Sequence, residues 1–586
     1  MTIYRRMMSA PQTQPLEESV ESLRTRAAWL ETELAKERAR VQELLQERDQ
    51  LRAAYEQLRL ELELLKRRLF VAKAERVDTQ ALEQEFAGKQ AELDALTKKL
   101  QGDATPEGPP PPPCRPKPVR PKPAGRRDLR DATLPEERIE LSDPVMEQQV
   151  KRGLAERIGF EESCKLAWQR GGHRRLVLAR VKYRIVGDAP QTPLVTAPLP
   201  KQTLSRCLAA PSLLAHIAVD KHCDGLPLFR IEDRFTRDGV KLDRGTMSRW
   251  LEDLGGTLGA TVIAAARNEA LHSAFCIATD ATGVLVQPIP TGKRQPCRRG
   301  HYFVQIADRD HVFFEYTPRE TSDAVGEMFR GFSGYVLADA KSVYDLLFQS
   351  PQLRSQLSAP HQGDPSVRHE VGCWAHARRK FWEAALAHST VAREGLFRIG
   401  RFFDLEAQWR GEPPQQRKRL RDASLRPELE AFFAWVLPEY QKVRDQRGLL
   451  RTALGYVVRQ KAALMRFLDD GRLPMDNNGS ERQLRRIAVG RKAWLFVGSD
   501  DHAAAAGHLL SLIASARLHS LDPETYLREL IRVLPHWPKD RYLELAPKYW
   551  AKTRARLDPL QLQAELGPLS LPPPLPSTTE EQPTPH

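Results

Sequence analysis

The sequence has few cysteines and no long apolar run. Its seven cysteines are scattered over 586 residues and never form a C-x-x-C pair, which argues against a disulfide framework or a four-cysteine zinc module. No uninterrupted apolar run approaches the length of a membrane span, and the N-terminal MTIYRRMMSAPQTQP lacks the apolar core of a signal peptide. We therefore expect a soluble protein of the reducing cytoplasm with no membrane partner.

Acidic residues are outnumbered by basic ones. The formal net charge is +14 and the isoelectric point is near 9.4, so a polyanion such as DNA is the simplest partner. A chain of this length exceeds what one hydrophobic core usually supports, which predicts several domains.

The first 105 residues are predicted to form an oligomerisation helix. From Leu23 to Leu69, apolar residues recur at alternating intervals of four and three, and twelve of the fourteen positions are apolar. This pattern is typical of a coiled coil and suits self-association into a homo-oligomer. Residues 106–130 are rich in proline and basic residues, so they are predicted to be an extended linker; a solvated linker is favoured over one that contacts DNA phosphates.

The next two segments differ in character. Residues 131–200 are predicted to contain a helix and then a strand from Leu176 to Val186. Residues 201–262 contain short helices, and the last of these is predicted to start at the capping residue Asp243. Two helices joined by a turn at Gly239 resemble a helix-turn-helix, although an ordinary helical bundle would give a similar pattern. In a helix-turn-helix, the DNA-facing residues would be Thr246, Ser248 and Arg249.

From about residue 265 the pattern changes to strands, and two of these strands carry an aspartate. The order is three antiparallel strands, a helix and a returning strand, which matches the opening of a ribonuclease H-like α/β fold. Asp280 is expected late on the first strand and Asp339 late on the fourth, where the two would converge. Each alone could be an ordinary turn residue, but a pair at equivalent strand ends favours a shared Mg²⁺ or Mn²⁺.

A third carboxylate is expected on a later helix, in the stretch MDNNGSERQLRRIAVGRK at 475–492. Glu481 stands there among basic residues. It could be the acid of a capping box that begins at Asn478, but with Asp280 and Asp339 in place, the role of third metal ligand is favoured. Arg482 and Arg485 share a helix face and are candidates for holding a DNA strand.

Glu370–Ala387, before this helix, is the densest part of the remaining sequence. Cys373 and His376 have the spacing of half a zinc site, but no second half is visible, so packing or hydrogen bonding near the site is favoured and no zinc is expected. Arg378 and Arg379 follow on a helix and could reach phosphates. The core is thus predicted as 265–387 and 471–545, with a helical insertion at 388–470 and a disordered tail at 546–586.

Several of these motifs together resemble the IS66 family of bacterial insertion-sequence transposases. The resemblance runs from about residue 200 to 550 and rests on TDATG, GYVLADAKSVYDLL, CWAHARRKFW, DNNGSERQLRRIAVGRKAWLFVGSD and DPETYLRELI, in that order. It implies a DDE-type enzyme in which Asp280, Asp339 and Glu481 bind Mg²⁺ or Mn²⁺. Such an enzyme cuts double-stranded DNA at the terminal inverted repeats of its element and joins the ends to target DNA.

The resemblance also implies a nucleoid-associated bacterial protein, with small accessory proteins of the same element as further candidate partners. Two departures stand out. Family members commonly carry a cysteine-rich zinc-binding segment where this chain has only Cys164, at about 140–190, so that domain is expected to be degenerate. Family members also often have an acidic residue where this chain has Ala281. Two alternatives remain open: a catalytically inactive DNA-binding or self-associating protein, and a ribonuclease H-like nuclease.

Overall fold

The computed structural model describes residues 134–576, apart from 170, 187–193, 289–295, 351–363 and 388, together with scattered positions between 28 and 95. Residues 1–123 and 124–586 form two compact units. In the first unit, the described positions at 28–43 and 84–95 are helical. The predicted coiled-coil seam and the linker at 106–130 lie outside the described residues.

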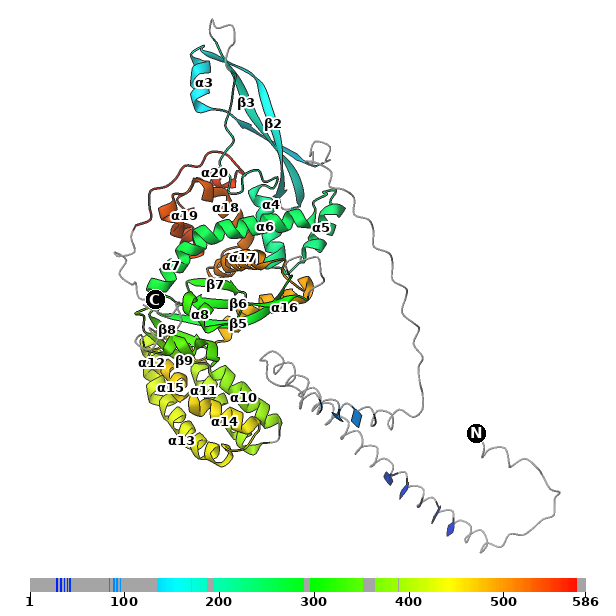
Figure 1. Cartoon of the computed structure of the whole chain (residues 1–586), viewed down its shortest axis with the longest axis vertical. Coiled ribbons are helices and arrows are strands. Elements are labelled where there is room, and N and C mark those ends of the chain that lie inside the picture. The colour runs from blue at the N-terminus through cyan, green and yellow to red at the C-terminus, as the bar shows by residue number, and fades with distance from the viewer. Residues whose placement is uncertain are drawn as a thin grey trace, which may run out of the picture. The chain divides into compact units, whose positions relative to one another are not determined.

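The second unit begins with a small sheet in the strand order β1-β3-β2, with β4 paired to β3. Its longest strands, β2 and β3, form the hairpin seen in Figure 1. The predicted helix and the strand near 176–186 are present, but β2 was not predicted. Its outer side chains are held by cross-strand ion pairs, such as Arg184 with Glu156 at 2.8 Å, so β2 lacks a clear apolar alternation. The elements are β1 (Glu136–Leu141), α3 (Pro144–Lys151), β2 (Ala155–Gln169), β3 (Gly172–Ile185) and β4 (Leu194–Thr196).

Four helices follow. The second, α5, is joined by a turn at Gly239 to a long helical segment made of α6 and α7. Asp243 caps α6 as predicted, because its side chain accepts hydrogen bonds from the backbone of Gly245 and Thr246. The predicted domain boundary at 262–265 falls inside a continuous helical segment, since α6 continues through a π-helical turn at Gly259–Ile263 into α7 without a break. The helices are α4 (Pro211–His222), α5 (Leu228–Arg237), α6 (Arg244–Leu258) and α7 (Ala264–Ser273).

The central sheet has five strands in the order β7-β6-β5-β8-β9. β5, β6 and β7 are antiparallel neighbours, whereas β8 runs parallel to β5 and β9 runs parallel to β8. The four predicted strands and the helix between them are confirmed, and β9 is an additional strand. The elements are β5 (Cys276–Val286), β6 (Arg298–Ala307), β7 (His311–Thr317), α8 (Ser322–Met328), β8 (Gly334–Ala338) and β9 (Arg368–Gly372).

The segment between β9 and the second half of the core is helical, as predicted for 388–470. Its core is aromatic: the ring of Trp374 lies 5.2 Å from that of Phe402 and 5.7 Å from that of Phe432. Buried Arg421 pairs with Glu406 and donates to backbone carbonyls of the connection that returns to the sheet. The helices are α10 (Trp374–Leu386), α11 (Thr390–Gln408), α12 (Pro414–Leu420), α13 (Arg426–Val443), α14 (Leu449–Arg459) and α15 (Lys461–Met465).

Helices α16 and α17 then cover the central sheet, and the chain continues beyond the predicted core (Figure 1). The prediction of a disordered tail from 546 is wrong for the described part, because Trp550 is buried and Arg541 donates to the Pro572 carbonyl at 3.0 Å. Within the described residues, no helix is long and apolar enough to cross a membrane. These helices are α16 (Asn478–Trp494), α17 (Asp500–Leu518), α18 (Pro523–Val533), α19 (Pro547–Arg554) and α20 (Pro559–Gln563).

Glu269 of α7 ties the start of β7 to α19. Its carboxylate lies 2.8 Å from His311 Nε2 and 2.9 Å from Lys548 Nζ, and it also accepts a hydrogen bond from Tyr549. Although burial opposes its charge, these partners lower the pKa of Glu269 from 4.5 to about 2. Because the folded pKa is the lower one, the stabilisation is complete above about pH 4.5 and is lost as the pH falls toward 2.

We therefore expect Glu269→Gln to lower the free energy of unfolding at pH 7 and to cost less at pH 3.5. Urea denaturation at both pH values measures the difference. Glu394→Gln on α11, whose carboxylate is about half exposed and pairs with Arg398, serves as a control with little effect at either pH. A cost of Glu269→Gln that stays the same at both pH values would contradict this account.

Candidate active site

Asp280 and Asp339 lie at equivalent places on neighbouring parallel strands. The last paired residues of β5 and β8 are Ala278 and Leu337, and each aspartate follows two residues later. Parallel strands that end their pairing together bring such side chains to one edge of the sheet. Burial and the charge of Asp339 raise the pKa of Asp280 to about 7, which indicates that the two carboxylates are close enough to repel each other.

The expectation that Asp280 ends its strand is wrong. β5 continues to Val286 because its other edge pairs with β6 over its whole length, and the buried side chains of Val284 and Val286 extend the apolar alternation. Asp280 therefore lies within β5, two residues after its pairing with β8 ends. Its Oδ1 accepts a hydrogen bond of 2.7 Å from the Ala281 backbone.

A lysine lies beside the second aspartate. Lys341 Nζ is 3.6 Å from Asp339 Oδ2 and 3.5 Å from Glu320 Oε1. Although burial opposes its charge, the neighbouring carboxylates of Asp339 and Glu320 raise the pKa of Lys341. Asp339 Oδ1 is buried and has no hydrogen-bond partner within the described part of the chain. An acceptor oxygen in that position can still take a ligand.

Helix α16 starts against the same strand. Asn477, its N-cap residue, is 1% exposed; its Nδ2 donates to the Thr279 carbonyl at 2.7 Å and its backbone N–H donates to Cys373 Sγ at 3.2 Å. These contacts hold the start of α16 between β5, one residue before Asp280, and α10. The N-cap of α16 is Asn477 and no side chain caps the helix, so the alternative of a capping box that begins at Asn478 is not formed.

Glu481 lies in the first turn of α16, facing α10. Its Oε1 is 3.8 Å from His376 Nε2, and its side chain is 48% exposed. Burial lowers the pKa of His376, while Asp339 and Glu481 both act in the opposite direction. The structure therefore brings Asp280, Asp339, Glu481 and His376 into one electrostatic neighbourhood.

Carboxylate oxygens are the main potential metal donors of this site. Cys373 is buried and accepts a hydrogen bond from Asn477, so packing and hydrogen bonding account for its position beside the site. Among the described residues, no three histidine, cysteine, aspartate or glutamate side chains gather closely enough to hold a metal. Two carboxylates with a free buried oxygen nevertheless suit a hard divalent cation. Glu481, whose side chain is 48% exposed, is the carboxylate of the set most open to solvent.

The predicted DNA-contacting residues fall into two groups. Arg378 and Arg379 are exposed on α10, where the Arg378 guanidinium stacks 5.6 Å from the centre of the Phe403 ring and Arg379 pairs with Glu383. The second group surrounds a cavity of about 680 Å³ between α6 and α16 and includes Ser248, Arg482 and Arg485. Thr246 and Arg249 lie beside it on α6, hydrogen-bonded to each other at 3.4 Å.

Sequence reasoning missed two residues of the site, Lys341 and Asn477. Lys341 follows Asp339 by two residues. Its closeness in sequence to that carboxylate is the only feature of the sequence that could have indicated its place in the site. Asn477 is one of a pair of asparagines, and nothing in the sequence distinguishes it from the partly exposed Asn478.

Two family models match the chain. The model described as "Transposase IS66 family" matches residues 206–505, and that of the "IS66 C-terminal element" matches residues 511–547. Similar proteins of Sinorhizobium fredii (strain NBRC 101917 / NGR234) include the uncharacterized proteins y4qI and y4hP. The first is 28% identical over 67% of this chain and 71% of its own length, and the second is 26% identical over 61% and 65%.

Asn477 is expected to contribute more to stability than its neighbour. Asn477→Ala removes a buried hydrogen bond and leaves the Thr279 carbonyl unsatisfied, which should lower the free energy of unfolding by about 1–3 kcal/mol. Asn478→Ala is the matched control, with an expected effect within about 0.5 kcal/mol. Urea denaturation of both variants measures this. Equal costs at the two positions would show that Asn477 does not anchor α16.

Proposed function

This chain belongs to the IS66 family of transposases, and we propose that it is a DDE-type transposase that cleaves the ends of its element and joins them to target DNA. The observation that carries the proposal is the convergence of Asp280 and Asp339 across the β5–β8 pair. Strand order and direction in the central sheet further support a ribonuclease H-like catalytic domain.

The proposed ligands of divalent cations, Mg²⁺ or Mn²⁺, are Asp280, Asp339 and Glu481. When bound, a pair of such cations activates the attacking oxygen and stabilises the leaving oxygen of an in-line phosphoryl transfer. Asp280 lies on β5 and Asp339 directly follows β8, whereas Glu481 is carried by the first turn of α16. The chain's task is to position the DNA phosphate among these groups, so no covalent protein–DNA intermediate is needed.

Other residues of the site support this arrangement. Lys341 offsets the charge of Asp339 and Glu320, which lowers the electrostatic cost of gathering carboxylates there. Asn477 fixes the start of α16 against β5 and so positions the backbone of Glu481 in the first turn of that helix. His376 lies against Glu481 and restricts the directions open to that carboxylate.

The proposed DNA interface includes the two groups of residues around the site. The first group is Arg378 and Arg379 on α10, the helix that Glu481 faces. The second includes Arg482 and Arg485, which follow Glu481 along α16. Guanidinium groups suit phosphate oxygens. On α6, the proposed DNA-facing residues are Thr246, Ser248 and Arg249, of a helix-turn-helix formed by α5 and α6. Self-association through residues 23–69 would bring two element ends together.

Asp339→Asn tests the chemistry. With Mg²⁺ and the element's own ends, strand joining should fall by roughly a thousandfold or more, because a carboxylate ligand is lost. Binding to the ends should stay within about twofold of the wild type. Asp345→Asn, at an exposed position six residues later, is the matched control and should leave joining unchanged.

Products separate the alternatives. Joining that survives in Asp339→Asn would refute the assignment of this ligand. Cleaved but never joined DNA from the wild type would point instead to a ribonuclease H-like nuclease. No nicking at all, with ends bound, would point to an inactive DNA-binding protein.

Arg482→Ala tests the phosphate contacts. The slope of the logarithm of the binding constant against the logarithm of the salt concentration should become shallower by about 0.9 for each lost contact with duplex DNA. Arg393→Ala, exposed on α11, is the control and should leave the slope unchanged. DNA joining and a salt slope that are both undiminished in Arg482→Ala would remove this residue from the interface.

A further inference from the structure

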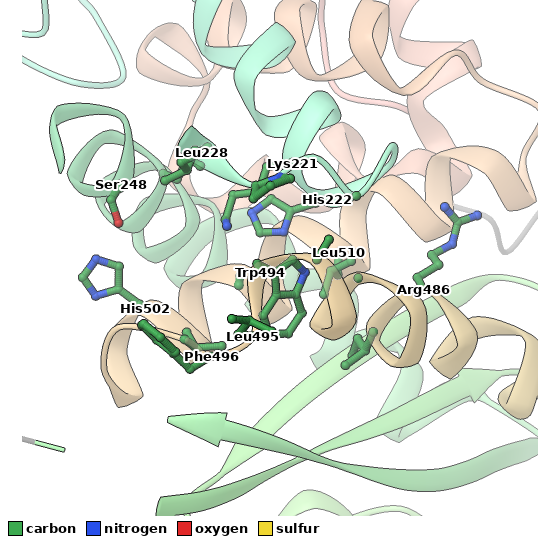
Figure 2. A pocket seen from close by; sticks show the side chains of 18 of the residues that line it. Lys221, His222, Leu228, Ser248, Arg486, Trp494, Leu495, Phe496, His502 and Leu510 are labelled. Carbon is green, nitrogen blue, oxygen red and sulfur yellow. The ribbon is translucent and has the colours of Figure 1, made fainter. Parts of the chain in front are cut away.

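Beyond the carboxylates, α16 lines the cavity of about 680 Å³, which is within the range of roughly 300–1,000 Å³ typical of ligand sites. Figure 2 shows its walls: Lys221 and His222 at the end of α4 lie across from Trp494, with Phe496 and His502 to one side and Arg486 to the other. The cavity therefore has an aromatic floor and a rim with basic groups.

The aromatic floor depends on the end of α16. A Cβ at Gly490 would come within 2.7 Å of Trp494 Nε1, so the glycine lets the indole lie flat along the helix. Leu495 has a φ of 66°, a strained value for a leucine, and backbone strain of this kind concentrates at functional sites. After that turn Leu495 and Phe496 remain 62% and 43% exposed. Apolar side chains left open in this way are available to a ligand.

The opposite wall is cationic and has few carboxylates to balance it. Burial lowers the pKa of Lys221 to about 8 and that of His222 to about 3, so at neutral pH the lysine is largely charged and the imidazole is neutral. No carboxylate in the described part of the chain forms an ion pair with either. Of the acidic residues at the cavity, Glu252 is paired with His502 at 3.1 Å and Asp224 is exposed.

Three more cations line the cavity from α16: Arg482, Arg485 and Arg486. Arg485 and Arg486 lie three and four residues after Arg482, so each is its neighbour on the helix surface. An apolar floor beneath unbalanced cations is complementary to a ligand with a flat apolar face and an anionic edge. A nucleotide has both, because its base stacks on aromatic rings and its phosphate pairs with guanidinium groups.

We propose that this cavity binds an unpaired nucleotide of the DNA end, with its base against Trp494 and Phe496, while Arg486, Arg485 and Arg482 hold the phosphates of the strand that leads from this nucleotide back to the active site. This inference rests on the proposed function, since it takes DNA as the ligand. A paired base keeps its faces stacked within the duplex, so only an unpaired or extruded one can enter. At about 1.5 Å per residue, Trp494 lies about 20 Å from Glu481. The bound nucleotide is therefore several positions from the reacting phosphate.

The test compares two DNAs with the full-length protein in EDTA, so that no chemistry occurs. One is a blunt duplex, and the other is the same duplex with six unpaired nucleotides at its 3′ end, one of them fluorescent 2-aminopurine. The wild type should bind the second DNA roughly tenfold more tightly, which corresponds to one stacked base, and should quench the 2-aminopurine.

Phe496→Ala should remove most of that preference and the quenching, while its affinity for the blunt duplex stays within about twofold. Phe496 is partly exposed, so its truncation spares the core; Trp494→Phe, which keeps a ring, should retain most of the preference. Phe397→Ala, at a 71% exposed aromatic on α11, is the matched control and should change neither value.

Three results would overturn the proposal. The first is equal affinity of the wild type for both DNAs. The second is an undiminished preference when the unpaired nucleotides lack bases, which would mean that only phosphates are bound. The third is a shift in sedimentation of Phe496→Ala with DNA binding unchanged, which would assign the cavity to a segment of this chain or to a second copy. Wild-type joining with Mg²⁺ tests the proposed function separately, so a protein that joins ends but shows no preference would lose only this inference.

Discussion

The parallel pairing of β5 with β8 is the constraint on which the rest of the site depends. It brings Asp280 and Asp339 to one edge of the sheet, partly buried, where burial and mutual repulsion both oppose charge. Such a pair is unfavourable unless a cation compensates it. Lys341 supplies part of that compensation from the side, and Asp339 still keeps one buried oxygen without a partner among the described residues. These electrostatics support the proposed divalent cation at this edge.

Helix α16 links this edge to the proposed DNA interface. Its first residue is fixed by the contacts of Asn477 with β5 and α10, its first turn carries Glu481, and its following turns carry arginines along one cavity wall. A single helix therefore relates the third proposed carboxylate ligand to the side chains that we propose contact DNA. Within this one stretch, the acid lies beside His376 and the arginines line the cavity.

Much of the central sheet could be predicted from the sequence, because strongly apolar strands and their turns carry a local signal. That Asp280 and Asp339 follow the last paired residues of two neighbouring strands could be predicted from the topology. Other features depend on partners distant in the chain. β2 is held by ion pairs with β3, Asn477 differs from Asn478 only by what it touches, and residues 547–576 are ordered by Arg541 and the core beneath Trp550. The predicted end of β5 at Asp280 was wrong because β5 pairs with β8 only as far as Ala278 but with β6 as far as Val286. The cavity beside Arg482 and Arg485 could not be predicted from the sequence, because it forms where the distant helices α4, α6 and α16 come together.

The central claim is that Asp280 and Asp339 share a divalent cation, and its most direct test is anomalous X-ray scattering from crystals grown with Mn²⁺ and element-end DNA. The account predicts an anomalous peak between these two carboxylates, with Glu481 or a DNA phosphate oxygen completing the ligands. Strong peaks elsewhere on the protein, with none between Asp280 and Asp339 while DNA is bound, would contradict it.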